Sequence, residues 1–164
     1  GGTVGNAIVD HPGVPLISFT GSPPVGWGIR QRQPRKEVAL ELGNATPVIV
    51  EADADLPLAA AKVAGSAFTN AGQSCISVQR VYVQATVHDR FLEDLCERVE
   101  ALTVGDPLDE ATDVGPVIDA GSRERIASWI SEAAAAGAEV VTGGEVEGTL
   151  IRPTVLDGIE PTMK

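Results

Sequence analysis

One of the two cysteines of this 164-residue chain directly follows Gly-Gln-Ser, in the polar stretch NAGQSC at residues 70–75. A cysteine is most often a buried structural residue, because its thiol behaves as a small hydrophobic group. Cys75 differs, since it lies among small and amide side chains. The backbone N–H groups of such a turn can stabilise a thiolate and, later, an oxyanion. Cys75 is therefore a candidate nucleophile.

The other cysteine, Cys96, fits the structural interpretation. It lies beside Leu92 and Leu95 in a predicted amphipathic helix over residues 87–102. Two cysteines cannot form a disulfide framework, and no signal-like leader opens the chain. We therefore expect reduced thiols and a cytoplasmic location.

A nucleophilic thiol needs a group that moves protons. His11 is expected in a loop and His88 at an exposed helix start, so a Cys–His pair is not expected, and the scattered His and Cys lack metal-ligand spacing. The remaining candidate is Glu41, in the apolar strand ending Val-Ala-Leu-Glu-Leu. A glutamate there is as often an outward strand residue as a base. If it points inward, burial favours its protonated form and makes it a usable general base.

A possible anion site lies at Phe19-Thr20-Gly21-Ser22, where a strand ends and a helix is expected to begin. The first N–H groups of a helix and its dipole attract phosphate. The signal is weak by itself, because there is no GxGxxG pattern and many such turns hold nothing.

Composition limits the function classes. A chain of this length supports one domain with its own core, and 43% of its residues are hydrophobic. No apolar run approaches the roughly 20 residues of a membrane span. The formal charge of −11 disfavours nucleic acid and anionic membrane surfaces, because both attract a positive field. We expect neither as a partner.

Short apolar runs alternate with helical patterns along the chain. Strands are expected over residues 16–19, 38–42, 47–50, 78–83, 138–141 and 152–156. Helices are expected over residues 23–33, 55–70, 87–102 and 120–136. This alternation predicts an α/β fold with a largely parallel sheet and flanking helices.

Several motifs in order resemble those of the aldehyde dehydrogenase superfamily, over essentially the whole chain. They are Phe19-Thr20-Gly21-Ser22, Leu40-Glu41-Leu42-Gly43, Asp53-Ala54-Asp55, Gly72-Gln73-Ser74-Cys75, Val104-Gly105-Asp106-Pro107, Gly115-Pro116-Val117-Ile118 and Pro153-Thr154-Val155-Leu156. The resemblance implies part of an aldehyde dehydrogenase-like fold. Residues 1–43 would be the C-terminal end of the dinucleotide-binding domain and residues 44–164 the major part of the catalytic domain.

The resemblance also implies a chemistry. The Cys75 thiolate would attack an aldehyde, hydride would pass to NAD or NADP, and water activated by Glu41 would hydrolyse the thioester to a carboxylic acid. Gly21 and Ser22 match the segment near the cofactor pyrophosphate, and Leu42 and Gly43 match the backbone near the nicotinamide. The amino-acid sequence around Cys75 is similar to that of the lactaldehyde and nonphosphorylating glyceraldehyde-3-phosphate dehydrogenase subgroup.

Two departures limit the resemblance. The family's Glu-Leu-Gly-Gly-Lys pattern is here Glu-Leu-Gly-Asn-Ala at residues 41–45, although asparagine tolerates positive φ. The family's upstream and downstream segments, including a second oxyanion donor, do not occur in this sequence. Both ends look cut, so we expect a piece of a longer chain with little or no dehydrogenase activity alone.

The resemblance implies a small-molecule aldehyde substrate and a full-length protein that forms homodimers or homotetramers. Two other interpretations stay open. The chain could be a noncatalytic interaction module, which an exposed apolar patch would favour. Cys75 could instead serve mainly as a redox-sensitive thiol, which rapid oxidation without aldehyde turnover would favour.

Overall fold

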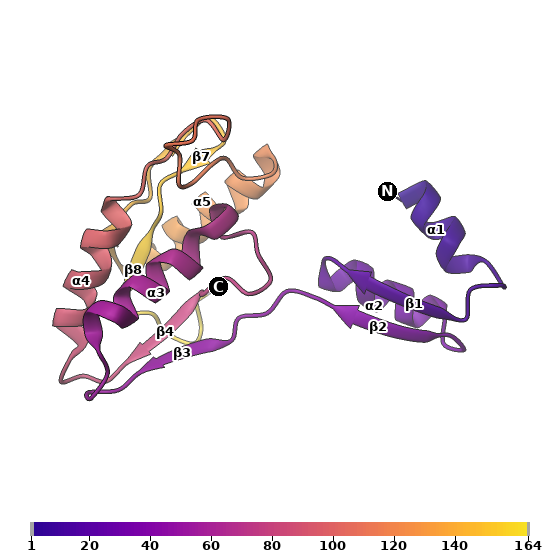
Figure 1. Cartoon of the computed structure of the whole chain (residues 1–164), viewed down its shortest axis with the longest axis horizontal. Coiled ribbons are helices and arrows are strands. Elements are labelled where there is room, and N and C mark those ends of the chain that lie inside the picture. Colours follow the sequence, from indigo (N-terminus) through magenta and orange to yellow (C-terminus); the bar gives the residue numbers. More distant parts are fainter. Residues whose placement is uncertain (1, 164) are drawn as a thin grey trace. The chain divides into compact units, whose positions relative to one another are not determined.

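The computed structural model describes residues 2–163, and the chain divides into two compact units, Gly1–Asn44 and Ala45–Lys164. We describe each unit by itself, and Figure 1 labels their elements. The assignment of the units to a dinucleotide-binding and a catalytic domain stays a prediction. Within residues 2–163 no helix combines the length and the apolar character that crossing a membrane requires.

The first unit is a strand–helix–strand arrangement preceded by a helix. Its elements are α1 (Gly2–Asp10), β1 (Leu16–Thr20), α2 (Pro23–Arg32) and β2 (Glu37–Glu41). Strands β1 and β2 are parallel, and α2 makes the crossover that parallel strands require. Val9, Ile17 and Ile29 form its small buried core.

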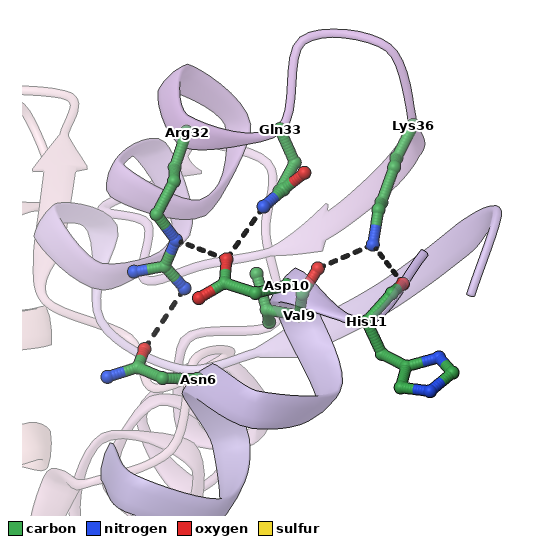
Figure 2. A network of polar contacts seen from close by, with 7 residues as sticks. All are labelled: Asn6, Val9, Asp10, His11, Arg32, Gln33 and Lys36. Atoms are coloured by element: carbon green, nitrogen blue, oxygen red, sulfur yellow. Dashed lines mark hydrogen bonds and ion pairs between the residues drawn. The ribbon is translucent and has the colours of Figure 1, made fainter. Parts of the chain in front are cut away.

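A polar network fastens the end of α1 to the chain after α2, as Figure 2 shows. Lys36 Nζ donates to the carbonyls of Val9 at 2.6 Å and His11 at 2.7 Å. A cation at a helix C-terminus satisfies carbonyls that lack helical partners and complements the helix dipole. Arg32 and Asp10 add an ion pair at 3.0 Å. These contacts stabilise a helix whose own sequence supports it weakly.

The second unit contains the remaining elements. They are β3 (Pro47–Val50), α3 (Leu56–Phe68), the 3₁₀ turn η1 (Thr69–Gly72), β4 (Arg80–Val83), α4 (His88–Glu100), α5 (Ala120–Ala135), β5 (Glu139–Thr142), β6 (Val146–Glu147), β7 (Leu150–Ile151) and β8 (Val155–Asp157). Strands β3 and β4 pair in parallel, with α3 as their crossover. The pairs β5–β8 and β6–β7 are antiparallel.

The main core of the second unit lies where α3 and α4 pack together beside β3 and β4 (Figure 1). The apolar stripe predicted for α4 is buried, with Phe91, Leu95 and Val99 inside. Ala60 of α3 is fully buried against this cluster, where a larger side chain would not fit the close packing. Asp55 caps α3, since its carboxylate accepts a hydrogen bond from the Leu58 N–H at 3.1 Å.

The predicted α/β fold class is confirmed, and the predicted helices and strands lie within a few residues of those observed. Helix α1 and the hairpin β6–β7 were not predicted. The α1 sequence contains two glycines and several β-branched residues, which give it low helix propensity. Contacts of Val9 and Lys36 hold it instead, and such tertiary contacts are absent from local sequence patterns.

His88, the first residue of α4, bridges two carboxylates. Its Nδ1 lies 2.9 Å from an oxygen of Asp89 and its Nε2 lies 3.1 Å from an oxygen of Asp157, at the end of β8. Hydrogen bonds first to Asp89 and then to Asp157 raise the pKa of His88 above its usual 6.5, although burial opposes the shift. When it is protonated, the imidazole donates to both carboxylates and so joins α4 to β8.

We predict that replacing His88 with Gln lowers stability in acid more than in base. His88 binds its proton more tightly when folded, so its contribution is full below the unfolded pKa of about 6.5 and is lost as pH rises through the raised folded value. For a partly exposed group the effect is below about 1 kcal/mol. Urea unfolding of both proteins at about pH 5.5 and 8.5 measures it. An equal difference at both values would contradict the prediction.

Candidate active site

The turn that precedes Cys75 begins with left-handed backbone. Three successive residues, Asn70, Ala71 and Gly72, have φ of 54°, 54° and 70°. Asparagine and glycine tolerate this region, but alanine does so at a cost of roughly 1–2 kcal/mol. The Thr69 hydroxyl donates to the Gly65 carbonyl at 2.5 Å, at the end of α3. The chain thereby stops the helix and reverses direction toward β4.

Cys75 lies at the tip of the next turn. The Ser77 N–H donates to the Ser74 carbonyl at 3.1 Å, which closes a turn with Cys75 and Ile76 between them. Cys75 is exposed, and Ile76 is 79% exposed. The predicted polar turn is therefore present and presents the thiol at the surface of its unit. The role of Cys75 as a nucleophile stays a prediction.

The side chain of Gln73 spans from this turn to a distant loop. Its Nε2 donates to the Asn70 carbonyl at 3.1 Å, and its Oε1 accepts from the Ile118 N–H at 2.8 Å. We name residues 69–77 the nucleophile turn and residues 114–118 the facing loop. One end of the amide therefore bonds within the nucleophile turn, and the other joins this turn to a residue 45 positions further along the chain.

A cavity of about 270 Å³ borders both segments and is lined also by the end of α3, by α5 and by the β7–β8 region. Ala71, Gly72 and Ser77 line it from the nucleophile turn, and Val114 and Val117 line it from the facing loop. Ser77 is 4% exposed, and within residues 2–163 its hydroxyl has no hydrogen-bond partner. Both segments therefore border incompletely filled space.

Cys96 occupies a different environment. It is half-buried in α4, and burial raises the pKa of its thiol, with smaller contributions from the charges of Glu100 and Asp157. A raised pKa leaves less thiolate at neutral pH, and the thiolate is the reactive form. Its environment agrees with the structural role expected from the sequence.

The other candidate residues lie in the first unit, at the carboxyl ends of β1 and β2. Thr20 and Glu41 are opposite each other in the parallel register, and the Gly21 N–H donates to the Glu41 carbonyl at 3.0 Å. In α/β sheets, ligands bind outside the carboxyl ends of the strands. The structure thus brings the Gly21-Ser22 and Glu41-Leu42 segments together.

Glu41 itself is exposed, as are Glu37 and Ala39 on the same side of β2. The strand alternates exposed and half-buried residues, so the outward alternative is the one observed in this unit. Leu42 is half-buried and lies against α2, where its methyl group would be 2.6 Å from a Cβ at Gly26. Gly43 is exposed and has no atom near a potential Cβ.

Ser22 forms the N-cap of α2, but its side chain makes no capping hydrogen bond. Pro23 and Pro24 follow it and carry no N–H. The helix start therefore offers fewer donors than an ordinary N-terminus. Within residues 2–163 no group of His, Cys, Asp and Glu side chains gathers closely enough to hold a metal ion.

Sequence reasoning did not find the roles of Gln73 and Ser77. Gln73 was part of a recognised motif, but its partner Ile118 is too distant in sequence for any local pattern to indicate. Ser77 is buried, although it follows the exposed Cys75 and Ile76, and no local pattern indicates this.

Comparison with known proteins identifies the family. The profile of the aldehyde dehydrogenase family matches residues 1–164. The chain is 42% identical over 164 residues to 3-sulfolactaldehyde dehydrogenase of Priestia aryabhattai, covering 100% of the chain and 34% of that relative. It is 41% identical to lactaldehyde dehydrogenase of Methanococcus maripaludis (strain C5), covering 96% of the chain and 34% of that relative. The chain therefore belongs to the aldehyde dehydrogenase family.

Solved structures agree. The NADP-dependent glyceraldehyde-3-phosphate dehydrogenase of Bacillus halodurans, solved with NADP, superposes with a TM-score of 0.95 at 40% identity. This match covers 100% of the chain and 34% of that enzyme. The chain thus has the fold of the corresponding part of an aldehyde dehydrogenase and spans about a third of the length of the relatives it matches.

We predict that Gly72→Ala destabilises the protein. A Cβ at this φ of +70° is strained and would lie 3.2 Å from the Ala67 carbonyl oxygen, so we expect a loss of roughly 1–2 kcal/mol. Gly65→Ala is the matched control, since Gly65 lies in α3 with no atom within 4 Å of a Cβ, and there alanine should stabilise by roughly 0.5–1 kcal/mol. Urea unfolding at neutral pH measures both. Equal effects of the two substitutions would contradict the prediction.

Proposed function

We propose that this chain carries the nucleophile and the general base of an NAD(P)-dependent aldehyde dehydrogenase, with Cys75 as nucleophile and Glu41 as base. The observation that carries the proposal is the exposure of Cys75 at the tip of a turn shaped by left-handed backbone, in a chain of this family. Backbone strain of this kind concentrates at functional sites. The rest of the reaction machinery would come from segments outside this chain.

The proposed reaction has two stages. The Sγ of Cys75 attacks the aldehyde carbon, and a hydride leaves the resulting hemithioacetal, so that a thioester to Cys75 remains. NAD or NADP, when bound, accepts this hydride. Glu41 then takes a proton from water, whose oxygen attacks the thioester carbon and releases the carboxylic acid and the thiolate. The net change is oxidation of an aldehyde to an acid, with one water consumed, one hydride passed to the cofactor and one proton released from Glu41 to solvent.

The first unit supports binding of the cofactor, with Gly21, Ser22, Leu42 and Gly43 as proposed contacts. A Cβ at residue 21 would lie 2.6 Å from Phe19 Cζ, so any larger residue here requires the Phe19 ring to move. Because Pro23 and Pro24 lack N–H groups, a pyrophosphate here would depend on Ser22, whose hydroxyl makes no capping bond. This strand-to-helix turn therefore fits a pyrophosphate, with fewer backbone N–H donors than an ordinary helix start provides.

Relatives support an aldehyde as the substrate class without selecting one member. They include enzymes named for 3-sulfolactaldehyde, vanillin, betaine aldehyde and lactaldehyde. We extend the proposal to a small aldehyde for the full-length protein, and to a cytoplasmic homodimer or homotetramer on the family resemblance. We also propose that the 164-residue piece alone oxidises aldehydes poorly.

We predict that Cys75 reacts faster with iodoacetamide in the folded chain than in the urea-unfolded chain. A turn that activates its nucleophile gives about a tenfold higher rate near pH 6 than the flexible chain does. The measurement is the intact mass of the Cys96→Ser protein over a pH series, with Cys75→Ser as the control. Equal rates in the folded and unfolded chains would remove the support for a nucleophile and leave a noncatalytic module.

We predict that Glu41→Gln in the full-length protein slows hydrolysis of a thioester at Cys75. p-Nitrophenyl acetate acetylates a reactive thiol without any hydride transfer, so the second stage can be followed alone by mass. Loss of a general base should lengthen the acetyl lifetime by about 100-fold or more, with the acetylation rate unchanged. Glu37→Gln is the matched control, because Glu37 is an exposed glutamate on the same face of β2. Equal lifetimes in the two variants would exclude Glu41 as the base.

A further inference from the structure

We propose that Gln73 is a positioning residue for Cys75, and that its side-chain amide fastens the nucleophile turn to the facing loop. The inference rests on the proposed function of Cys75 and adds a residue that acts through it. Gln73 precedes Cys75 by two residues and touches no reacting atom in the proposal.

The hydrogen bonds of Gln73 converge on one carbonyl and one N–H. Its backbone N–H and its Nε2 both donate to the Asn70 carbonyl, each at 3.1 Å. Its Oε1 accepts from the Ile118 N–H at 2.8 Å. The side chain therefore closes the left-handed part of the turn on itself and ties it to the facing loop.

The facing loop gives this link a buried anchor, since Val114 and Val117 are 3% and 6% exposed. Both valines line a cavity of about 270 Å³ together with Ala71, Gly72 and residues of α5, β7 and β8. Unfilled volume beside the turn forfeits dispersion contacts. The Gln73 amide therefore supplies a directional attachment on a side of the turn that packing does not fill.

The nucleophile turn also has a conformational reason to relax. Ala71 is held at φ 54°, and such a residue persists only when its surroundings determine its conformation. The next backbone contact toward β4, from the Val78 N–H to the Ser66 carbonyl, is long at 3.4 Å. Without Gln73, the turn relaxes toward the cavity that Ala71 and Gly72 border, and the orientation of Cys75 changes.

Gln84 provides a matched control within the same unit. Its Oε1 accepts from the Ala52 N–H at 2.8 Å, the same kind of bond at the same distance as that between Gln73 and Ile118. This bond joins the chain after β4 to the chain after β3 and lies outside the nucleophile turn. Gln84→Met therefore removes an equivalent hydrogen bond without changing the contacts of Gln73.

The test uses the 164-residue chain with Cys96→Ser, so that only Cys75 is labelled. Iodoacetamide rates over a pH series and hydrogen exchange of the Ile118 amide are measured for Gln73→Met, Gln73→Glu and Gln84→Met. We expect Gln73→Met to lower the Cys75 rate near pH 6 and to speed Ile118 exchange, each by roughly five- to tenfold. Gln84→Met should change neither.

Gln73→Glu tests the donor end and the acceptor end of the amide separately. A carboxylate still accepts from the Ile118 N–H but cannot donate to the Asn70 carbonyl. We expect Ile118 exchange to stay slow while the Cys75 rate falls. This pattern distinguishes positioning from general stability, because a merely structural loss would move both readings together.

The outcomes separate this inference from the proposed function. Slow wild-type labelling, equal to that of the unfolded chain, overturns the role of Cys75 and this inference with it. Fast wild-type labelling that Gln73→Met leaves unchanged overturns the inference alone. Equal losses in Gln73→Met and Gln84→Met also overturn it, since they would show a general effect of losing one hydrogen bond.

Discussion

The left-handed backbone of Asn70, Ala71 and Gly72 is the constraint on which the candidate site depends. Helix α3 connects two parallel strands, so the chain must leave the helix and re-enter the sheet in the direction of β3. Here backbone of positive φ ends α3 and makes the reversal abrupt, whereas α2 ends with its C-cap Gln33 at φ −121°. Cys75 is placed on the loop that this reversal creates, before β4 begins, and its exposure follows from the same geometry.

A strained reversal also needs support from outside itself. The facing loop supplies it through the N–H of Ile118, while the cavity that borders the turn limits apolar packing on that side. A few directional hydrogen bonds therefore carry a task that close packing performs elsewhere in the unit, where Ala60 and Phe91 are almost completely buried. Local stability therefore differs across this unit, and functional loops commonly belong to the least stable parts of a protein.

The sequence indicated most elements because their signals are local. The stripe of Phe91, Leu95 and Val99 has helical periodicity, and the Gly-Gln-Ser-Cys stretch has the composition of a polar turn. The attachment of Gln73 to Ile118 and the helix α1 were not accessible, since both depend on partners far along the chain. Alternation in β2 also could not decide which way Glu41 faces, because either face of a strand can be the covered one.

The two proposed catalytic residues are positioned by opposite kinds of structure. Glu41 ends a regular parallel strand, where the register with β1 fixes its backbone and the Gly21 N–H holds its carbonyl. Cys75 lies in irregular backbone that side-chain hydrogen bonds maintain. A regular strand end tolerates substitution of its side chain without moving its backbone, whereas the turn does not. Changes near Cys75 therefore alter geometry and chemistry together, and changes at Glu41 alter chemistry alone.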